Sequence, residues 1–474
     1  MRNYLKHYIN GEWVESTGSE TMEVLNPATE EVLGHISLGT KEDLDRAVKA
    51  ARNAFPAFAQ TSKEYRIELL EKIADEYEKR KNELVEIITE ELGAPLKLSE
   101  NYHYILGYAH FKKAAEILRN YSFIEKRGNS TIIKEPIGVC GLITPWNFPT
   151  NQPSTKIASA LAAGCTMVMK PAEITPYAAM MLADIFEAAG LPNGVFNLVN
   201  GAGDVIGNAI SSHPNIDFVS FTGSNVAGRK VMENASKDIK KVALELGGKS
   251  PLIVLKDADV AKAAKTAVTN ISTNSGQACI AATRVIVPRE MKAEFEGKVK
   301  ELVAELAVGD PKQDNEVGPV VSKKQWDRIQ GYIQIGVDEG ATILTGGKGK
   351  PEGLNQGYFV KPTVFTDVRN DMTIAQDEIF GPVTTIITYD SLDEAIEIAN
   401  DTVYGLAGYV VGEDPEALKM AALGIRAGIV IVNDAPFDFS APFGGFKQSG
   451  IGREWGDFGI EEYLEPKAVM GIQS

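Results

Sequence analysis

Between residues 138 and 246, short apolar runs alternate with amphipathic segments, and this alternation constrains the fold more than any other feature of the chain. The runs have the length and composition of buried strands, and the segments between them have helical spacing of apolar residues. The expected strands are 139–143, 166–169, 195–198, 218–221 and 242–244, and the expected helices lie near 152–163, 175–189, 202–211 and 225–236. Strands separated by helices pair in parallel, so the pattern predicts an α/β fold with a parallel sheet flanked by helices.

A second series of the same kind runs from about residue 251 to 450, with apolar runs such as 251–254, 284–287 and 428–432. Ahead of both series, the apolar spacing predicts a helix over 41–55 and then one long helix, which Thr61 or Ser62 can cap and which Gly93 and Pro95 end. We expect the two series to meet near residue 246, and clefts at such boundaries are favoured ligand sites.

A carboxylate and a thiol lie in two glycine-marked strings close to that expected boundary. Glu245 stands in LELGGKSP (244–251) and Cys279 in NSGQACIAATR (274–284). A thiolate adds readily to a carbonyl carbon, and a carboxylate in a partly dry pocket can take a proton from the water that attacks the resulting thioester. The two strings therefore indicate a nucleophile and a general base.

Charge and hydropathy exclude several other classes of protein. The 474 residues include 48 Lys and Arg against 64 Asp and Glu, a formal net charge of -16, which disfavours nucleic acid and anionic membranes as partners. The N-terminus lacks the apolar core of a secretory signal. No apolar run reaches the roughly 18 residues that a membrane span needs.

The cysteines and histidines bear on location and metal binding. Only Cys140, Cys165 and Cys279 are present, and an odd, sparse set in a long chain favours reduced thiols in the cytoplasm. The five histidines are far apart in sequence, and no cluster of Cys or carboxylates completes a zinc pattern around any of them. We therefore expect no metal.

Loops after the expected strands carry signals for a dinucleotide. FTGSNVAG (221–228) places Gly223, Ser224 and Gly228 between a strand and a helix, where backbone N–H groups can hold a pyrophosphate. The string G-x-G-x-x-G is absent, and NGAGDVIG (200–207) has a different final spacing. In MVMKPAEITP (167–176), the carboxylate of Glu173 could accept both hydroxyls of an adenosine ribose and would repel a 2′-phosphate, which favours NAD over NADP.

Seven strings in a fixed order carry a resemblance to a known family. They are ITPWNFP (143–149), MVMKPAE, FTGSNVAG, LELGGKSP, SGQAC, DEIFGPV (377–383) and PFGGFKQSGIGRE (442–454). Together they resemble the aldehyde dehydrogenase superfamily, NAD(P)-dependent enzymes that oxidise aldehydes to carboxylic acids. The resemblance covers essentially the whole chain and is strongest to the hydrolytic, broad-specificity bacterial members.

The resemblance implies a role for each matching residue. Cys279 corresponds to the nucleophile that forms a thiohemiacetal and then a thioester, Asn147 with the backbone N–H of Cys279 to the oxyanion hole, and Glu245 to the base that activates water. Lys170 and Glu173 correspond to contacts of the adenosine ribose, Gly223 and Ser224 to the pyrophosphate site, and Glu378 and Phe380 to contacts of the nicotinamide end. The expected cofactor-binding set is Ile143, Thr144, Pro145, Trp146, Lys170, Glu173, Gly203, Gly207, Phe221, Thr222, Gly223, Ser224, Leu246, Gly247, Glu378 and Phe380.

Departures from the family pattern bear on the substrate. Ser272, followed by Thr273, stands where the family usually has an aromatic or aliphatic residue, seven residues before the cysteine, and Gln152 and Thr155 fall where many members carry large apolar side chains. A roomier or more polar entrance is expected. The expected substrate-contacting residues are Phe148, Gln152, Thr273, Phe437 and Phe443. No arginine clearly faces a second carboxylate, although the sequence does not place Arg284 or Arg453.

Other functions remain open at this point. A semialdehyde or betaine-aldehyde dehydrogenase would use the same machinery on another aldehyde. A CoA-acylating member would not need the base Glu245, and a phosphorylating member would need a cationic phosphate pocket that this acidic chain does not indicate. A cysteine hydrolase needs a histidine partner, and none lies near Cys279 in sequence. A non-catalytic structural role would not require Cys279, Glu245 and Asn147 together.

The resemblance also implies a division into domains. Residues 1–116 and 137–246 are expected to form a Rossmann-like NAD-binding domain, and residues 247–459 an α/β catalytic domain. Residues 117–136 and 460–474 read as extended pieces, which in the family form a small β flap between subunits. A homotetramer or dimer is therefore expected.

Overall fold

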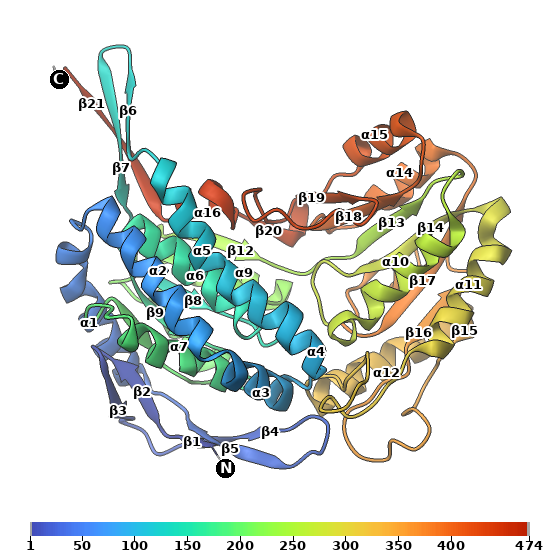
Figure 1. Cartoon of the computed structure of the whole chain (residues 1–474), viewed down its shortest axis with the longest axis horizontal. Helices are drawn as coiled ribbons and strands as arrows, with labels where there is room; N and C mark the ends of the chain where they lie inside the picture. The colour runs from blue at the N-terminus through green and yellow to red at the C-terminus, as the bar shows by residue number, and fades with distance from the viewer. Residues whose placement is uncertain (1, 472–474) are drawn as a thin grey trace.

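Two sheets of mostly parallel strands organise the molecule, each covered by helices on both faces (Figure 1). The computed structural model describes residues 2–471. The first sheet has the strand order β20-β12-β11-β8-β9-β10-β2-β3. Its parallel centre consists of β8 (Val139–Ile143), β9 (Thr166–Lys170), β10 (Phe196–Leu198), β11 (Phe218–Thr222) and β12 (Lys241–Glu245).

The central strands of this sheet are buried along their whole length, as expected for parallel strands with helices on both faces. Successive side chains point to opposite faces. Val139 and Val168 pack towards one helix layer, whereas Cys140 and Met167 pack towards the other. The first layer contains α1 (Lys41–Phe58), α8 (Asn208–Ser212) and α9 (Asn225–Ala235), and the second contains α6 (Asn151–Ala163), α7 (Tyr177–Ala188), α2 (Lys63–Lys79) and α5 (Ile105–Asn120).

The second sheet has the order β15-β16-β17-β14-β13-β18-β19, and only the β15–β16 pair is antiparallel. Its strands are β13 (Ser250–Val254), β14 (Ala282–Pro288), β15 (Thr342–Thr345), β16 (Thr363–Thr366), β17 (Val383–Tyr389), β18 (Ala407–Val411) and β19 (Ile429–Val432). Helices α10 (Val260–Ser272) and α11 (Lys292–Glu305) cover one face, and α14 (Leu392–Asn400) and α15 (Pro415–Gly424) cover the other. Helices α12 (Lys323–Asp338) and α13 (Thr373–Gln376) pack beside β16 and β17.

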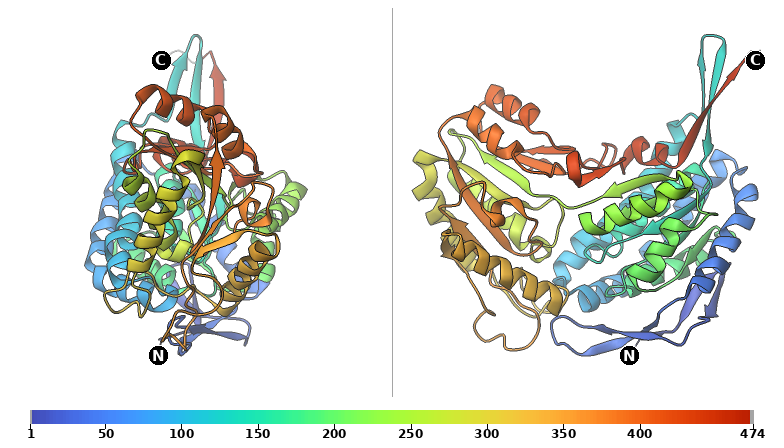
Figure 2. Two further views of the ribbon diagram at one scale, coloured as in Figure 1. Left: turned by 90° about the vertical axis from the view of Figure 1, so that its right-hand side faces the viewer. Right: turned by 180° about the vertical axis from the view of Figure 1, so that it is seen from behind.

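A third, antiparallel sheet projects away from the body and stands clear of both large sheets in every view (Figures 1 and 2). It is built from β6 (Ile124–Arg127), β7 (Ser130–Pro136) and β21 (Leu464–Met470). The short helix α16 (Gly456–Glu461) leads into β21, and the Ile137 N–H donates to the Tyr463 carbonyl at its base. The expected extended pieces thus meet in one sheet, although α5 continues to Asn120; residues 472–474 lie outside the described residues.

Several sequence-based expectations need correction. The expected long helix is two helices, α2 and α3 (Lys81–Leu92), because Arg80 leaves the helical conformation between them. Ser62 caps α2 by accepting from the Tyr65 N–H at 3.1 Å, and Gly93 ends α3 at a φ of 80°. The sequence pattern also missed the strands before residue 40: β1 (Arg2–Tyr4), β2 (Lys6–Ile9), β3 (Glu12–Glu15), β4 (Thr21–Leu25) and β5 (Val32–Ser37).

Two of these strands extend the first sheet, because β2 pairs antiparallel with β10, and β3 with β2. Strands β1, β5 and β4 form a small sheet of their own. The other edge of the first sheet is closed by β20 (Gly450–Ile451), which pairs with the end of β12 although it falls inside the expected second domain. The expected domain limits stay a prediction. Among residues 2–471, no helix has both the length and the apolar composition needed to cross a bilayer.

Candidate active site

The site lies where the first sheet passes the chain to the second. Glu245 is the last residue of β12, and the four residues that follow it lead directly into β13. Cys279 lies in the loop between the short helix η4 (Thr273–Gly276) and β14, the neighbour of β13. A Cβ atom at Gly248 would lie 2.3 Å from the Cys279 carbonyl oxygen, so the linker touches the loop that carries the thiol. The structure thus brings the two residues to one place.

Cys279 is a half-buried thiol beside an aromatic cluster. It packs against the cluster of Leu406, Phe443 and Trp455. Burial, together with the nearby carboxylates Glu378 and Glu245, raises the pKa of the Cys279 thiol well above its ordinary value. The thiol is therefore neutral at rest, and its attack on a carbonyl carbon requires a proton acceptor. Cys140 and Cys165, in contrast, are fully buried in the first sheet.

Glu245 is buried and has a carboxylate oxygen, Oε2, without a hydrogen-bond partner. Burial and the nearby Glu454 raise its pKa well above the ordinary value, while Lys156 acts in the opposite direction. Lys156 Nζ forms an ion pair with Glu454 and donates to Ser220 Oγ at 3.0 Å. This environment therefore favours the protonated carboxyl over the carboxylate more than water does.

Asn147 is held by the loop that carries the nucleophile. Its Nδ2 donates one N–H to the Gln277 carbonyl at 3.0 Å. The second N–H of the amide is not used in that bond and can donate to another acceptor. Asn274 Nδ2 donates to the Asn147 carbonyl at 2.9 Å. These two bonds tie the loop after β8 to the segment just before Cys279, so the amide and the thiol are placed by the same backbone.

Glu378 and Phe380 lie on the loop between α13 and β17. Glu378 Oε1 accepts from the Gly248 N–H at 3.0 Å, and burial raises the pKa of Glu378 to about 7. A Cβ atom at Gly247 would lie 2.4 Å from the Glu378 carboxylate, so a larger residue there would have to displace the Glu378 side chain. Phe380 has a φ of 63°, which is unusual for an aromatic residue, and its ring lies edge-on to Trp146 at 5.2 Å.

The expected cofactor residues gather at the carboxyl ends of the strands of the first sheet. Thr144 follows β8, and Thr222 is the last residue of β11. Each has a buried hydroxyl without a hydrogen-bond partner. Ser224 caps the 11-residue helix α9, next to Gly223. The other members lie on the same strand ends and the loops that follow them: Ile143, Pro145, Trp146, Gly203, Gly207, Phe221, Leu246 and Gly247.

Lys170 and Glu173 form an ion pair of 2.9 Å just after β9. Burial opposes ionisation of Glu173, but Lys170 and the backbone of Gly203 outweigh it and lower the pKa of this carboxyl. Glu173 is therefore a carboxylate at neutral pH. Its position beside Gly203 joins two parts of the expected cofactor site that are 30 residues apart in sequence.

The expected substrate residues fall into two groups. Phe148 is buried, stacks on His103 at 4.9 Å and lies edge-on to Tyr102 at 6.0 Å. Phe437 and Phe443 pack on Trp455, with ring centroids 5.8 Å and 4.6 Å away. Gln152 is buried in α6 with Oε1 unpartnered, and Thr273 is half-buried in η4. Phe443 and Phe437 share the aromatic cluster of Cys279.

The two arginines that the sequence could not place have structural contacts. Arg284 is fully buried and donates to the carbonyls of Lys249, Ile398 and Ala399 and to Asn370 Oδ1. Arg453 donates to the carbonyls of Gly445 and Gly452 and lies over the ring of Phe446. Both guanidinium groups are thus engaged by the protein itself.

Sequence reasoning missed four residues of the site: Lys156, Glu454, Asn274 and His103. Glu454 and Asn274 stand inside strings that were already singled out, PFGGFKQSGIGRE and NSGQACIAATR, so their position was a usable signal. Lys156 and His103 stand in ordinary helical sequence and carried none.

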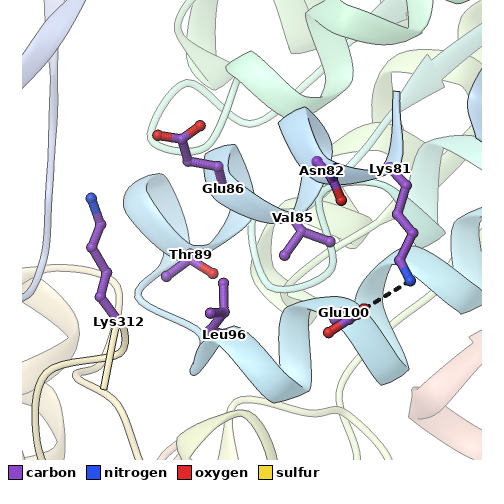
Figure 3. Close-up of a pocket in the computed structure, with 8 residues that line it drawn as sticks. All are labelled: Lys81, Asn82, Val85, Glu86, Thr89, Leu96, Glu100 and Lys312. Atoms are coloured by element: carbon purple, nitrogen blue, oxygen red, sulfur yellow. Dashed lines mark ion pairs between the residues drawn. The ribbon is translucent and has the colours of Figure 1, made fainter. Parts of the chain in front are cut away.

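A surface cavity of about 410 Å³ lies elsewhere, between α3, η1 (Ser99–Tyr104) and the loop that carries Lys312 (Figure 3). Three of its four charged side chains form ion pairs, Lys81 with Glu100 at 2.8 Å and Lys312 with the neighbouring Glu90 at 2.8 Å. Cys279, Glu245 and Asn147 do not line it. Within residues 2–471, no group of three or more His, Cys, Asp or Glu side chains is placed to hold a metal ion.

Comparison with known proteins decides the family. The model of the aldehyde dehydrogenase family matches residues 13–469. The chain belongs to the aldehyde dehydrogenase family. The resemblance inferred from the motifs is thereby confirmed, and so is the predicted class of enzyme.

Relatives of this aldehyde dehydrogenase match it over its whole length. A Staphylococcus haemolyticus protein named as an aldehyde dehydrogenase is 56% identical over 475 residues, covering 100% of both chains. The crystal structure of a cysteine-to-alanine mutant of aldehyde dehydrogenase C from Pseudomonas syringae, complexed with NAD+ and octanal, has a TM-score of 0.98 at 46% identity and covers 99% of this chain and 97% of that one. Betaine aldehyde dehydrogenase from Staphylococcus aureus in complex with NAD+ has a TM-score of 0.95 at 40% identity, covering 98% and 94%. These scores confirm the predicted α/β fold.

Proposed function

We propose that the protein oxidises an aldehyde to a carboxylic acid with NAD, through a thioester on Cys279 that Glu245-activated water hydrolyses. The observation that carries this proposal is the convergence of a half-buried thiol, a buried carboxyl and a carboxamide at one junction between the two sheets. Cys279, Glu245 and Asn147 supply the nucleophile, the base and the oxyanion donor that the reaction needs.

The residues present fit a dinucleotide. The unpartnered hydroxyls of Thr144 and Thr222 and the capped start of α9 at Ser224 offer polar groups to a pyrophosphate. Glu173, a carboxylate beside Gly203, would accept the hydroxyls of the adenosine ribose and disfavour a 2′-phosphate. Glu378 and Phe380 would hold the nicotinamide ribose and ring. Two solved relatives are complexes with NAD+, in agreement with this choice of cofactor.

In the first step, Cys279 Sγ bonds to the carbonyl carbon of the aldehyde, and the thiol proton leaves through water to the solvent. The carbonyl oxygen becomes an oxyanion, which accepts hydrogen bonds from the Asn147 amide and the Cys279 backbone N–H. When bound, NAD supplies the acceptor for the hydride of the thiohemiacetal carbon. Loss of that hydride leaves a thioester on Cys279.

In the second step, Glu245 as a carboxylate takes a proton from a water molecule whose oxygen attacks the thioester carbon. The C–S bond then breaks, the acid is released and the Cys279 thiol regains a proton. The raised pKa of Glu245 makes its carboxylate a stronger base than that of an exposed glutamate, which suits proton abstraction from water. The ion pair of Lys156 and Glu454 sets the charge around it.

The first test follows NADH and acid formation by purified protein with NAD and a panel of aldehydes, without CoA. Cys279→Ala is expected to lower the rate at least about 10³-fold, since a removed nucleophile leaves only binding effects. Cys140→Ala, which removes a buried thiol of the first sheet, is the matched control. Strict dependence on CoA would replace hydrolysis by the CoA-acylating alternative, and a Cys279→Ala enzyme that still forms NADH would contradict the proposed nucleophile.

The panel also addresses the substrate. Aromatic side chains at Phe148, Phe437 and Phe443 and the polar Gln152 and Thr273 support a small uncharged aldehyde over a carboxylate-bearing semialdehyde, because Arg284 and Arg453 are engaged by backbone carbonyls. One solved relative is a complex with octanal, and another is a betaine aldehyde dehydrogenase, so both compounds belong in the panel.

We also infer that the projecting sheet of β6, β7 and β21 joins subunits into a dimer or tetramer. Ile124 and Met470, on its outer strands, are 59% and 74% exposed, and apolar exposure on a projecting sheet suits a subunit contact. Sedimentation that showed only monomers at micromolar concentration would refute this.

A further inference from the structure

His103 is a fully buried histidine next to the proposed oxyanion donor. It lies on η1, a π-helical turn between α4 (Leu96–Leu98) and α5, and such turns are often found at functional sites. Its ring stacks on Phe148, the residue that follows Asn147, with centroids 4.9 Å apart and planes at 29°. The Thr150 hydroxyl donates to the His103 carbonyl at 3.0 Å. The histidine is thus fixed against the segment that carries Asn147.

The ring nitrogen Nε2 of His103 lies 3.3 Å from Oδ1 of Asn274, and both side chains are buried. Asn274 Nδ2 donates to the Asn147 carbonyl at 2.9 Å and to the Gln277 carbonyl at 3.2 Å. Because two carbonyl oxygens face this nitrogen, Oδ1 must face the histidine. Nε2 of His103 is therefore the donor.

Two carboxamides meet at a single oxygen as a result. Asn147 Nδ2 and Asn274 Nδ2 both donate to the carbonyl of Gln277, two residues before Cys279. A rotation of the Asn274 amide would present its oxygen to the carbonyls of Asn147 and Gln277 and so would repel both. The bond from His103 opposes that rotation.

The backbone at Asn274 is strained, and the side-chain hydrogen bonds stabilise this conformation. Asn274, Ser275 and Gly276 have φ values of 52°, 54° and 69°, three consecutive residues in the left-handed region. Such conformations are unfavourable for residues other than glycine and persist only when the surroundings fix them. The loop that presents Cys279 begins with this turn.

We propose that His103 is a positioning residue, which orients the Asn274 carboxamide and, through it, the Asn147 amide and the turn before Cys279. This inference rests on the proposed function, because it assigns to His103 the placement of the oxyanion donor. His103 contacts neither of the proposed reacting atoms. Burial lowers the pKa of His103 to about 4, so its ring is neutral and keeps one donor nitrogen at neutral pH.

The test compares three substitutions in the full-length enzyme. His103→Leu preserves the approximate volume of the side chain but has no hydrogen-bond donor. His103→Gln can place an amide N–H where Nε2 lies. His103→Asn carries the same amide on a shorter side chain that does not reach Asn274. We expect the single-turnover rate of NADH formation to fall about 10- to 100-fold for Leu and Asn, and to stay within about threefold of wild type for Gln.

Two further readouts separate positioning from packing. The affinity for NAD should stay within about twofold in all variants, since cofactor binding does not need the oxyanion donor. In an Asn147→Ala background, His103→Leu should cause little further loss, because residues that act through one group are not additive.

Three results would overturn the proposal: a wild-type rate in both His103→Leu and His103→Asn, equal loss in the Gln variant, or full additivity with Asn147→Ala. If His103→Leu does not fold, the comparison of His103→Asn with His103→Gln still tests the proposal. Failure of the proposed function looks different, since wild-type enzyme would then lack activity that depends on Cys279.

Discussion

Gly248 and Cys279 are in direct backbone contact, although they are 31 positions apart in the chain. A Cβ atom built at Gly248 would lie 2.3 Å from the Cys279 carbonyl oxygen and 3.3 Å from the Leu406 Cβ, so nothing larger than hydrogen fits. The Gly248 N–H also donates to Glu378. One glycine therefore fixes the distance between the linker after Glu245, the loop of the nucleophile and a proposed cofactor contact.

Gly248→Ala is expected to lower the rate of aldehyde oxidation about 100-fold, because the methyl group must displace the Cys279 loop or the linker by roughly 1 Å. Gly297→Ala makes the same chemical change on α11, where no atom lies within 4 Å of the added carbon, and should leave the rate unaltered. Steady-state kinetics measures both. Equal rates for the two variants would show that the contact is not needed.

Glu245→Gln should slow thioester hydrolysis more than thioester formation. We expect the first turnover of NADH to remain within several-fold of wild type, while steady-state turnover falls about 10²- to 10⁴-fold, as is typical on loss of a general base. Rapid-mixing measurements of NADH absorbance separate the two phases. Glu233→Gln, on the exposed surface of α9, is the control. Loss of the first turnover to the same extent would assign Glu245 to the attack step.

The affinity for NAD should weaken as pH falls below 7. Burial raises the pKa of Glu378 from 4.5 to about 7, so its carboxylate, the form proposed to hold the nicotinamide ribose, predominates only above pH 7. At pH 6 only about one tenth of the groups are ionised, which predicts roughly tenfold weaker binding than at pH 8. Calorimetric titration at both pH values measures this. Glu378→Gln should bind weakly with little pH dependence, and an unchanged pH slope in that variant would exclude Glu378 as the source.

Arg284→Met should destabilise the fold without altering the chemistry of the site. The guanidinium is buried and serves three backbone carbonyls and Asn370, so its removal leaves several buried acceptors unpaired. We expect a loss of about 3 kcal/mol or more in the free energy of unfolding, seen as an earlier urea midpoint. Arg289→Met, which breaks an exposed ion pair with Asp390, should leave the midpoint nearly unaltered. Equal midpoints in the two variants would refute the structural role.

Local pattern was sufficient for the parallel strands and the helices between them. The strands expected at 139–143 and 218–221 are β8 and, with one more residue, β11, because a strand buried on both faces must be a continuous apolar run. The strands β2 and β3 were missed for the opposite reason. Each has four residues and lies at or near the sheet edge, and β2 pairs with the distant β10 through Tyr8 and Leu198, so little in the local sequence marks them.

The residues that bear the proposed chemistry could be named from short strings, but their supports could not. Cys279, Glu245 and Asn147 stand among glycines and prolines, which mark turns and can be recognised in the sequence. Lys156, by contrast, meets Glu454 across 298 residues, and His103 meets Asn274 across 171. Glu454 and Asn274 stand in motif strings, but Lys156 and His103 are ordinary residues of their helices, so no local pattern marks either pair.

The sequence by itself determined the alternation of strands and helices and the three side chains proposed to react, because apolar periodicity and glycine-marked turns are local properties. Tertiary structure alone decided that the linker at Gly248 touches the nucleophile loop, that Glu245 is buried beside Glu454, and that His103 holds Asn274. Those relationships depend on how the two sheets pack together. Packing depends on the burial of apolar surface over the whole chain, so no short segment of the sequence predicts it.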